Sequence, residues 1–172
     1  MPRLVLTVIG DDRAGLVEAL AEAIGAHGGN WERSQMAELA GQFAGIVVVS
    51  VPDDRADELR SALARLDGLL DITAHPGIDE AAGAAPDGWA ELRIDLVGND
   101  QPGIVHDVSA ALARHGVSIE TMHTERRDAP MAGGQLFEAH IVARVPAGTE
   151  PIAVREELEQ LAARLLVDLT VG

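Results

Sequence analysis

The sequence predicts an α+β fold built from two βαββαβ sandwiches in tandem, and three observations support this prediction. First, the segment Gly10–Val17 returns as Gly98–Val105, so the chain contains an internal repeat. Second, residues 75–88 between the copies are rich in Ala, Gly, Pro and acidic residues and have no apolar periodicity, which is typical of a linker. Third, the apolar spacing alternates between strand and helix periods in the same order in both copies.

The repeat sets the expected domain boundaries. We expect a first domain at residues 1–75, a linker at 76–88 and a second domain at 89–172. The two copies also match each other farther along the chain, but there the matching residues are separated by a larger number of positions. The additional residues of the second copy fall near 128–134, where the Gly, Pro and Asp content predicts a loop.

Each copy begins with a strand followed by a helix. The strands are expected at 4–9 and 92–97, and the second of these alternates between apolar and polar residues. The helices have an apolar residue at every fourth position, which is the spacing of one buried face. These residues are Leu16, Leu20 and Ile24 in the first copy, and Ile104, Val108 and Leu112 in the second. A His-Gly pair closes each helix, because glycine tolerates the left-handed C-terminal cap.

The rest of each copy is expected to hold two strands, a second helix and a short last strand. The paired strands fall near 30–39 and 42–51, then near 117–127 and 135–145. The second helices bury Leu59, Leu63 and Leu66 in one copy, and Val154, Leu158 and Leu161 in the other. The last strands lie at 71–73 and 168–170. Each copy therefore has the order of a ferredoxin-like sandwich.

The composition excludes several functions. The chain of 172 residues has no Cys and no Lys, so it offers no thiolate nucleophile, no zinc-thiolate site and no Schiff-base lysine. Its 13 basic residues, all Arg, face 28 acidic ones, and the net charge is −15. A surface of that charge repels phosphate backbones, and the densest basic cluster is the pair Arg126-Arg127. We therefore expect no direct binding of nucleic acid.

The N-terminal residues lead straight into the first strand, without the charged and apolar regions of a signal peptide. The longest apolar run is far shorter than the roughly 20 residues of a membrane helix. We expect a cytoplasmic protein that does not enter membranes.

Two segments of the second copy carry a resemblance to a known family. These are Gly98–Val105, with the sequence GNDQPGIV, and Ala111–Glu120, with the sequence ALARHGVSIE. They resemble the ACT domain, a βαββαβ module that binds amino acids and regulates. The first copy resembles it too, so the resemblance covers nearly the whole chain apart from the linker. Two such units and the loop at 129–137 resemble the glycine cleavage system transcriptional repressor family.

The loop between the first strand and the first helix of each copy is the candidate ligand site. A helix N-terminus has unpaired backbone N–H groups and a dipole that favours a carboxylate. Gly15 and Gly103 lack a side chain, so a ligand can approach the backbone closely. Nearby Asp and Asn side chains can accept hydrogen bonds from an ammonium group, so a zwitterionic amino acid suits the loop. The candidate residues are Asp11, Asp12, Arg13, Ala14, Gly15 and Leu16, and then Asn99, Asp100, Gln101, Pro102, Gly103 and Ile104.

The same loop residues also have a purely structural interpretation. Asp12 and Asp100 are candidate helix N-caps, each contributing about 1 kcal/mol. Pro102 suits the first turn of a helix. Gly15 and Gly103 are compatible with close packing of the helix on the sheet. From the residues alone, each of these structural roles is an open alternative to ligand binding.

The two copies depart from the family pattern at different places. Ala14 stands where the motif usually has Pro, and Ser118 stands where it usually has Asn. The resemblance implies that this Asn, which is Asn30 in the first copy, reaches a ligand held by the loop of a partner domain. We therefore expect the better site to combine residues 99–104 with Asn30. The mirror site, which combines residues 11–16 with Ser118, is expected to be weaker.

No catalytic residues, cofactor or metal site are expected. His123 and His140 lie on neighbouring expected strands and are able to approach each other, but a capped or surface histidine is the more common role. Trp31 is expected in the core or at a domain interface. The acidic pairs of the chain fall on expected helix surfaces.

These observations favour a non-enzymatic regulatory protein. The resemblance implies that it senses a small amino acid of the glycine or serine class and acts through a protein partner, such as a transcriptional activator. An alternative is the regulatory subunit of an amino-acid biosynthetic enzyme, although the small acetolactate synthase subunits pair an ACT-like domain with a different one. An enzyme in its own right is a third class, which no nucleophile–base pair supports. Whether two chains form a homodimer through their exposed sheet edges stays an open question.

Overall fold

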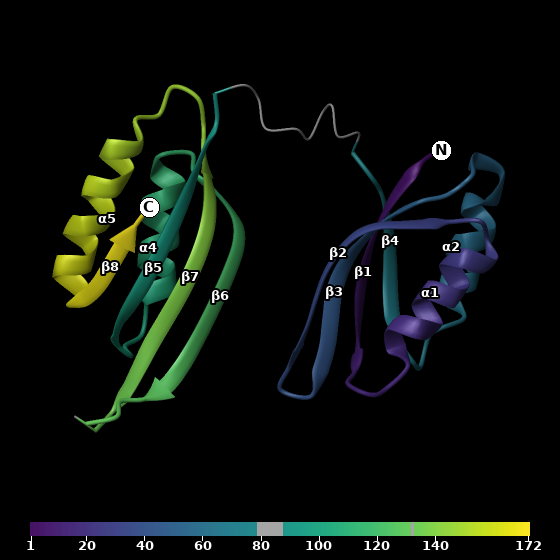
Figure 1. Ribbon diagram of the computed structural model, residues 1–172, viewed down its shortest axis with the longest axis horizontal. Helices are drawn as coiled ribbons and strands as arrows, with labels where there is room; N and C mark the ends of the chain where they lie inside the picture. Colours follow the sequence, from purple (N-terminus) through teal and green to yellow (C-terminus); the bar gives the residue numbers. More distant parts are fainter. Residues whose placement is uncertain (79–87, 132) are drawn as a thin grey trace. The chain divides into compact units, whose positions relative to one another are not determined.

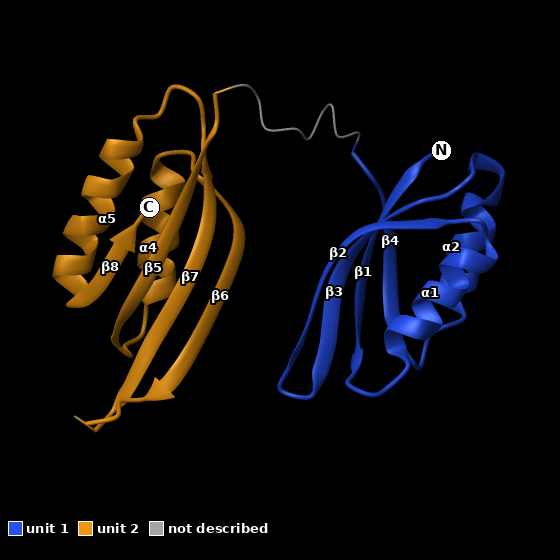
Figure 2. Cartoon of the chain, viewed as in Figure 1, with its two compact units in different colours: residues 1–84 blue, residues 85–172 orange. Residues whose placement is uncertain are grey.

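The computed structural model describes residues 1–78, 88–131 and 133–172, which fold as two compact units. Unit 1 comprises Met1–Ala84 and unit 2 comprises Ala85–Gly172 (Figures 1 and 2). Most of the predicted linker at 76–88 lies outside the described residues, but Pro76 is the last residue of a strand. Among the described residues, none of the helices combines the length and apolar character needed to cross a membrane.

Unit 1 has the order βαββαβ, with one short 3-10 turn before its second helix. Its elements are β1 (Arg3–Asp11), α1 (Leu16–Ala26), β2 (Asn30–Leu39), β3 (Gln42–Ser50), η1 (Asp53–Arg55), α2 (Ala56–Ala64) and β4 (Asp71–Pro76). The four strands form one antiparallel sheet in the order β2-β3-β1-β4. Both helices lie on one side of this sheet (Figure 1).

Unit 2 repeats the same order and topology. Its elements are β5 (Ala90–Asn99), α4 (Ile104–Arg114), β6 (Ser118–Asp128), β7 (Gln135–Val145), α5 (Pro151–Leu165) and β8 (Val167–Val171). The sheet order is β6-β7-β5-β8, again antiparallel. The predicted pair of ferredoxin-like βαββαβ sandwiches, an α+β fold, is therefore confirmed.

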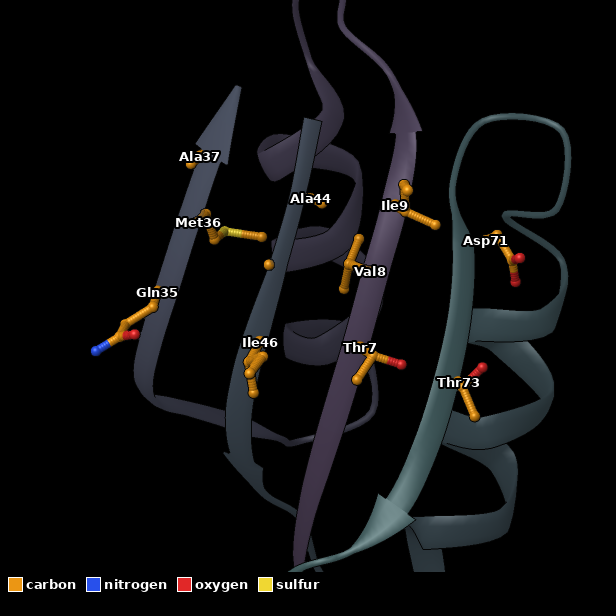
Figure 3. A pocket seen from close by; sticks show the side chains of 11 residues that line it. Thr7, Val8, Ile9, Gln35, Met36, Ala37, Ala44, Ile46, Asp71 and Thr73 are labelled. Atoms are coloured by element: carbon orange, nitrogen blue, oxygen red, sulfur yellow. The ribbon is translucent and has the colours of Figure 1, made fainter. Parts of the chain in front are cut away.

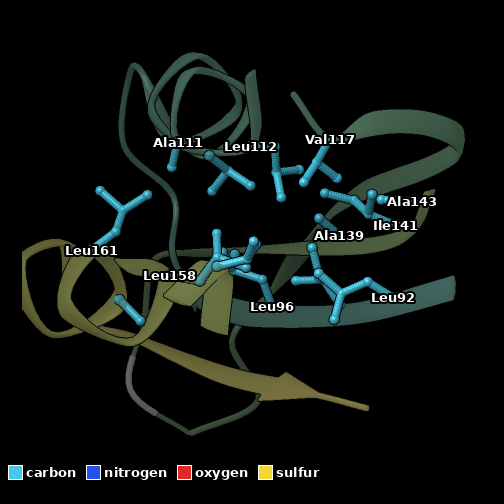
Figure 4. Close-up of a cluster of buried hydrophobic side chains, with 14 of the residues drawn as sticks. Leu92, Leu96, Ala111, Leu112, Val117, Ala139, Ile141, Ala143, Leu158 and Leu161 are labelled. Carbon is cyan, nitrogen blue, oxygen red and sulfur yellow. The ribbon is translucent and has the colours of Figure 1, made fainter. Parts of the chain in front are cut away.

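Each unit has its own hydrophobic core between its helices and one face of its sheet. In unit 1 the predicted stripe of α1 is buried, and Leu20 is fully inaccessible. In unit 2 the stripe of α4 packs with α5 and the inner residues of β5 and β7 (Figure 4). Alternate residues along the central strands are buried, as Leu4, Leu6 and Val8 are in β1. The opposite face of each sheet is not covered by its own helices.

One detail differs from the sequence-based expectations. Leu66 was predicted on the second helix of unit 1, but α2 ends at Ala64 and Leu66 lies in the turns that follow, partly buried against the core. Trp31 also packs partly buried against this core, as predicted for a core residue. The hairpin of unit 1 turns through only Ala40 and Gly41, whereas residues 129–134 separate β6 from β7. The loop predicted near 128–134 thus agrees with the longer connection between β6 and β7, although residue 132 lies outside the described residues.

Candidate functional site

The two strand-to-helix loops have the same backbone geometry. In each unit the first helix starts directly after a glycine at positive φ, which is +90° at Gly15 and +95° at Gly103. L-residues rarely adopt this conformation, so the backbone geometry itself requires glycine. A Cβ atom built on either glycine would meet nothing within 4 Å. The side of each loop toward which this Cβ would point is therefore open to an approaching molecule.

The start of each helix presents free backbone N–H groups. The first intrahelical bonds run from Ala19 N to Gly15 O at 3.0 Å and from Asp107 N to Gly103 O at 2.9 Å. The N–H groups of residues 16–18 and 104–106 therefore have no intrahelical acceptor. No side chain caps either helix. Together with the helix dipole, these donors make both loops suited to a carboxylate.

The structure excludes the particular structural roles that were expected as alternatives for several loop residues. Asp12 and Asp100 are not N-caps, because the cap positions are occupied by Gly15 and Gly103. Pro102 precedes the cap and so lies outside the first helical turn. The two cap glycines do not serve close packing either, because open space surrounds their missing Cβ.

Close packing is instead the role of the glycine at the end of each first strand. A Cβ on Gly10 would lie 2.6 Å from the carbonyl oxygen of Leu69, and one on Gly98 would lie 2.3 Å from Cγ1 of Val167. These separations are too short for any real Cβ contact. The repeat therefore preserves one glycine for packing and another for backbone conformation.

The acidic side chains of the loops are partly engaged within the protein. In unit 1, Gln42 Nε2 donates to Asp11 Oδ1 at 2.7 Å. In unit 2, Arg126 Nε lies 2.7 Å from Asp100 Oδ2. The Asp12 carboxylate has no hydrogen bond or ion pair with the rest of the described chain. Asn99 is exposed at the end of β5.

A polar side chain at the same repeat position ties each loop to the segment that follows the second helix. Arg13 Nη2 donates to the carbonyl of Gly68 at 3.1 Å, and Gln101 Nε2 donates to that of Leu165 at 2.7 Å. These two predicted ligand-binding side chains are therefore used for anchoring the loop in the structure.

The apolar residues at the helix starts belong to the core. Leu16 and Ile104 are each only 3% exposed, so they can offer a ligand their backbone N–H but not their side chain. Ala14 and Pro102 are exposed on the loops. The loops are surface features, and in unit 1 a hollow of about 330 Å³ adjoins Asp11 and Arg13.

Asn30 and Ser118 lie far from the loop of their own unit. Asn30 starts β2 and pairs with Ser50, whereas the loop begins at Asp11, which pairs with Gln42 at the other end of β3. Eight steps of about 3.3 Å along a strand separate these ends by about 26 Å. Ser118 holds the matching place in unit 2. Neither side chain therefore completes the loop of its own unit.

Two of the six histidines, His123 and His140, lie together on the open face of the unit 2 sheet. The rings of His123 and His140 are stacked with centroids 6.4 Å apart, and His140 Nδ1 lies 2.5 Å from Asp95 Oδ1. Across the described residues, no group of three or more His, Asp or Glu side chains is arranged to hold a metal ion. His27 and His115 cap the C-termini of α1 and α4, as expected from their helix-end positions.

Sequence reasoning missed the partners of the loop acids, Gln42 and Arg126. Gln42 lies on β3, next to β1, and Arg126 lies on β6, which is separated from β5 by β7, so their contacts depend on strand register rather than on any local motif. The charge of Arg126 was noticed in the sequence, but nothing there connects it to Asp100.

Comparisons with known proteins agree with this geometry. Residues 2–75 match one family model described as an ACT domain, and residues 92–163 match a second model of the same description. The two matches fall on the two units and include both loops. Among curated proteins, the comparison finds no match.

Two solved structures match over nearly the full chain. One is an unknown protein from Galdieria sulphuraria, with 29% identity, a TM-score of 0.88, and coverage of 99% of this chain and 97% of that one. The other is a putative glycine cleavage system transcriptional repressor, with 17% identity, a TM-score of 0.70, and coverage of 99% and 96%. At that identity, the second match shows a shared fold. The tandem arrangement of two such domains is thus shared with known structures.

Proposed function

Because this chain belongs to the ACT-domain family, with two such domains in tandem, we propose that it is a non-enzymatic regulatory protein that senses a small amino acid of the glycine or serine class. The observation that carries this proposal is the geometry of the two loops. Each places free backbone N–H groups beside a cap glycine with open space around it. This arrangement suits the carboxylate of an amino acid.

The proposed site of unit 2 binds both charged ends of the ligand. The N–H groups of residues 104–106 hold the carboxylate, and the exposed side chain of Asn99 accepts a hydrogen bond from the ammonium group. Asp100 already pairs with Arg126, so its charge is partly balanced and its free oxygen contributes the second acceptor. A zwitterion has no net charge, so the net charge of −15 on the protein does not repel it.

We propose that unit 2 holds the better of the two sites. Pro102 limits the backbone freedom of its loop, whereas Ala14 leaves the loop of unit 1 less restricted. The proposal extends to Asn30, whose side-chain amide is predicted to contact the ligand held at residues 99–104. Ser118, at the matching position, has a shorter side chain and is predicted to contribute less.

The regulatory output is proposed to pass through a protein partner. The fold match to a glycine cleavage system repressor supports a transcriptional role, and the acidic composition supports action on an activator protein rather than on DNA. The alternative is the regulatory subunit of an amino-acid biosynthetic enzyme. Capture of partners by the tagged full chain from its native host separates the two: a transcription factor supports the first, and a large catalytic subunit supports the second.

A thermal-shift screen of the full chain against the twenty amino acids tests ligand binding. We expect stabilisation by glycine, serine or a similarly small amino acid. Gly103→Val should abolish this stabilisation because a β-branched side chain disfavours the positive φ of the loop and also fills the space that the ligand needs, whereas Gly15→Val should reduce it less. If no amino acid shifts the unfolding midpoint, or if Gly103→Val responds like the parent chain, the proposed site is wrong.

Two matched alanine variants test the contribution of the strand starts. Asn30→Ala is expected to weaken the ligand-induced shift more than Ser118→Ala does. Both residues are exposed at the start of an edge strand, so neither change should alter the stability of the free protein by more than about 0.5 kcal/mol. Equal effects of the two variants on ligand binding would remove Asn30 from the site.

The non-enzymatic part of the proposal has its own test. The ligand identified by the screen should be recovered unchanged after long incubation with the protein. Consumption of that ligand at a rate proportional to protein concentration, and lost on mutation of one acidic residue, would contradict it.

A further inference from the structure

The open face of the unit 1 sheet is apolar along its two central strands. Figure 3 shows side chains of this face from β1, β3 and the two outer strands. Ile46 and Ile9 are 51% and 47% exposed, which is unusual for large apolar residues on neighbouring central strands. Away from the strand ends, the outward residues of the central strands are Val5, Thr7, Ile9, Ala44, Ile46 and Val48. None of these six is charged.

The charged residues of this face lie on its outer strands and at the two ends of β1, where Arg3 and Asp11 point outward. Arg33 belongs to β2 and Asp71 belongs to β4, the two edges of the sheet. The centre of the face is therefore an uncharged strip in a protein with a net charge of −15.

The matching face of unit 2 is charged in its centre. Asp95 and His140 occupy the places of Thr7 and Ile46, and they pair with each other. Glu138 also points out from this face and pairs with Arg127. Because the unit 2 sheet forms with these charged residues, the fold does not require apolar residues here. The apolar strip of unit 1 is thus a property of that unit and not of the fold.

The surface of the strip is uneven, as packing against another protein surface requires. An open hollow of about 630 Å³ lies on it, lined by the small residues Ala37 and Ala44 and by the larger Ile9 and Ile46. Large side chains next to small ones give a surface of projections and depressions, which a complementary apolar surface can fill.

We propose that this face packs against the same face of a second copy of the chain, forming a homodimer. Two copies of so acidic a protein repel each other over most of their surfaces. Contact through the uncharged strip brings the fewest acidic groups together. A second copy also necessarily presents the matching apolar surface, as an isologous interface requires.

The size of the face indicates a weak, reversible dimer. Four strands about 4.8 Å apart and about seven residues of 3.3 Å each give a face of roughly 19 by 23 Å, or about 440 Å² per copy. The total of about 900 Å² is below the roughly 1,200–2,000 Å² of stable interfaces. A dissociation constant above about 1 µM follows.

Sedimentation velocity of the full chain over a concentration range of about 1 µM to 1 mM tests the proposal. We expect a monomer at the low end and a growing dimer fraction at the high end. Added salt should strengthen the dimer, because it screens the repulsion between the two acidic chains while leaving the apolar contact intact.

Charged substitutions locate the interface. Ile46→Glu and, separately, Ile9→Glu should each weaken dimerisation at least ten-fold, because a carboxylate would be buried against an apolar surface. Both side chains are about half exposed, so the monomer should keep its fold, which far-UV circular dichroism checks. Thr121→Glu, on the exposed open face of unit 2, is the matched control and should dimerise like the parent chain.

A monomer at every concentration would overturn the proposal and leave the face for a different apolar partner. A dimer that withstands both Ile46→Glu and Ile9→Glu would also overturn it, because the contact would then lie on another surface.

Discussion

The two units of this protein share a fold but differ in what their surfaces offer. Both have the same strand order, the same register of the first strand against the third, and the same cap glycine before the first helix. Their open sheet faces differ: Ile46 of unit 1 corresponds to His140 of unit 2. The loops differ as well, since Asp100 pairs with Arg126 while Asp12 has no such partner in the described structure.

This comparison separates the residues that the fold needs from those that serve another purpose. Gly10 and Gly98 recur because each allows the first strand to approach the chain beyond the second helix. Gly15 and Gly103 recur because of their positive φ. Positions that have diverged, such as Ile46 and its counterpart, are free of such constraints, so their chemistry is available for function.

The largest expected effect tests whether the two cores are independent. Leu20 is fully buried in the core of unit 1, so Leu20→Ala should cost about 2–5 kcal/mol of that unit's stability. Unit 2 has a separate core and should keep its own unfolding transition. Calorimetry should show one transition moved and one unchanged. Equal shifts of the whole profile would mean that the units unfold together, and an unchanged midpoint would show that Leu20 is not buried.

A smaller effect separates the two roles of glycine. Gly10→Ala should cost about 1–3 kcal/mol, because the new Cβ meets a backbone carbonyl that cannot rotate away. Gly15→Ala meets no atom and should cost only the roughly 1–2 kcal/mol of a left-handed backbone. Chemical denaturation of the two variants gives the order. If Gly10→Ala leaves the stability of unit 1 unchanged, the packing role assigned to Gly10 is wrong.

The loop anchors should contribute less. Removal of the Gln101 bond to Leu165 by Gln101→Ala should cost about 0.5–1.5 kcal/mol, and Arg13→Ala should have a similar effect in unit 1. Hydrogen exchange of the amides after each loop should become faster in the matching unit only. Unchanged exchange in both variants would show that these side chains do not hold the loops.

The smallest expected effect is a pH dependence confined to unit 2. Hydrogen bonds from Arg114 and His115 lower the pKa of Glu157 below its ordinary value of 4.5. A lowered folded-state pKa stabilises the fold above the unfolded value, and this contribution is lost as the pH falls through the folded value. Glu157→Gln should therefore flatten the acid limb of the unit 2 transition. Glu156→Gln, with the same charge change on the same helix, should leave that limb steep, and identical profiles would contradict the assignment.

Much of the fold could be predicted from the sequence because the repeat and the apolar spacing are local signals. The stripe of Leu16, Leu20 and Ile24 has the helical period, and all three residues are buried. The end of α2 was harder to predict, because Leu66 keeps the apolar spacing although the helix has already ended.

The glycine loops that the sequence singles out do lie at the helix starts, but their role as ligand sites stays a prediction and their side-chain contacts were not predicted. The glycine loops were identified, yet their aspartates were considered as caps, because short polar residues before a helix usually have that role. The pairing of Arg126 with Asp100 depends on how β6 aligns with β5 through β7, and no local pattern encodes that alignment. The contrast between the open faces likewise becomes visible only when the strand register places Ile46 opposite Thr7.

The most direct test of the account is a ¹⁵N NMR titration of the full chain with the amino acid that stabilises it best. The account predicts that the largest amide shifts occur at residues 104–106, whose N–H groups are proposed to bind the carboxylate, with smaller shifts at residues 16–18. Shifts that cluster away from both helix starts, for example on the open sheet faces, would contradict the central claim that these loops are the ligand sites.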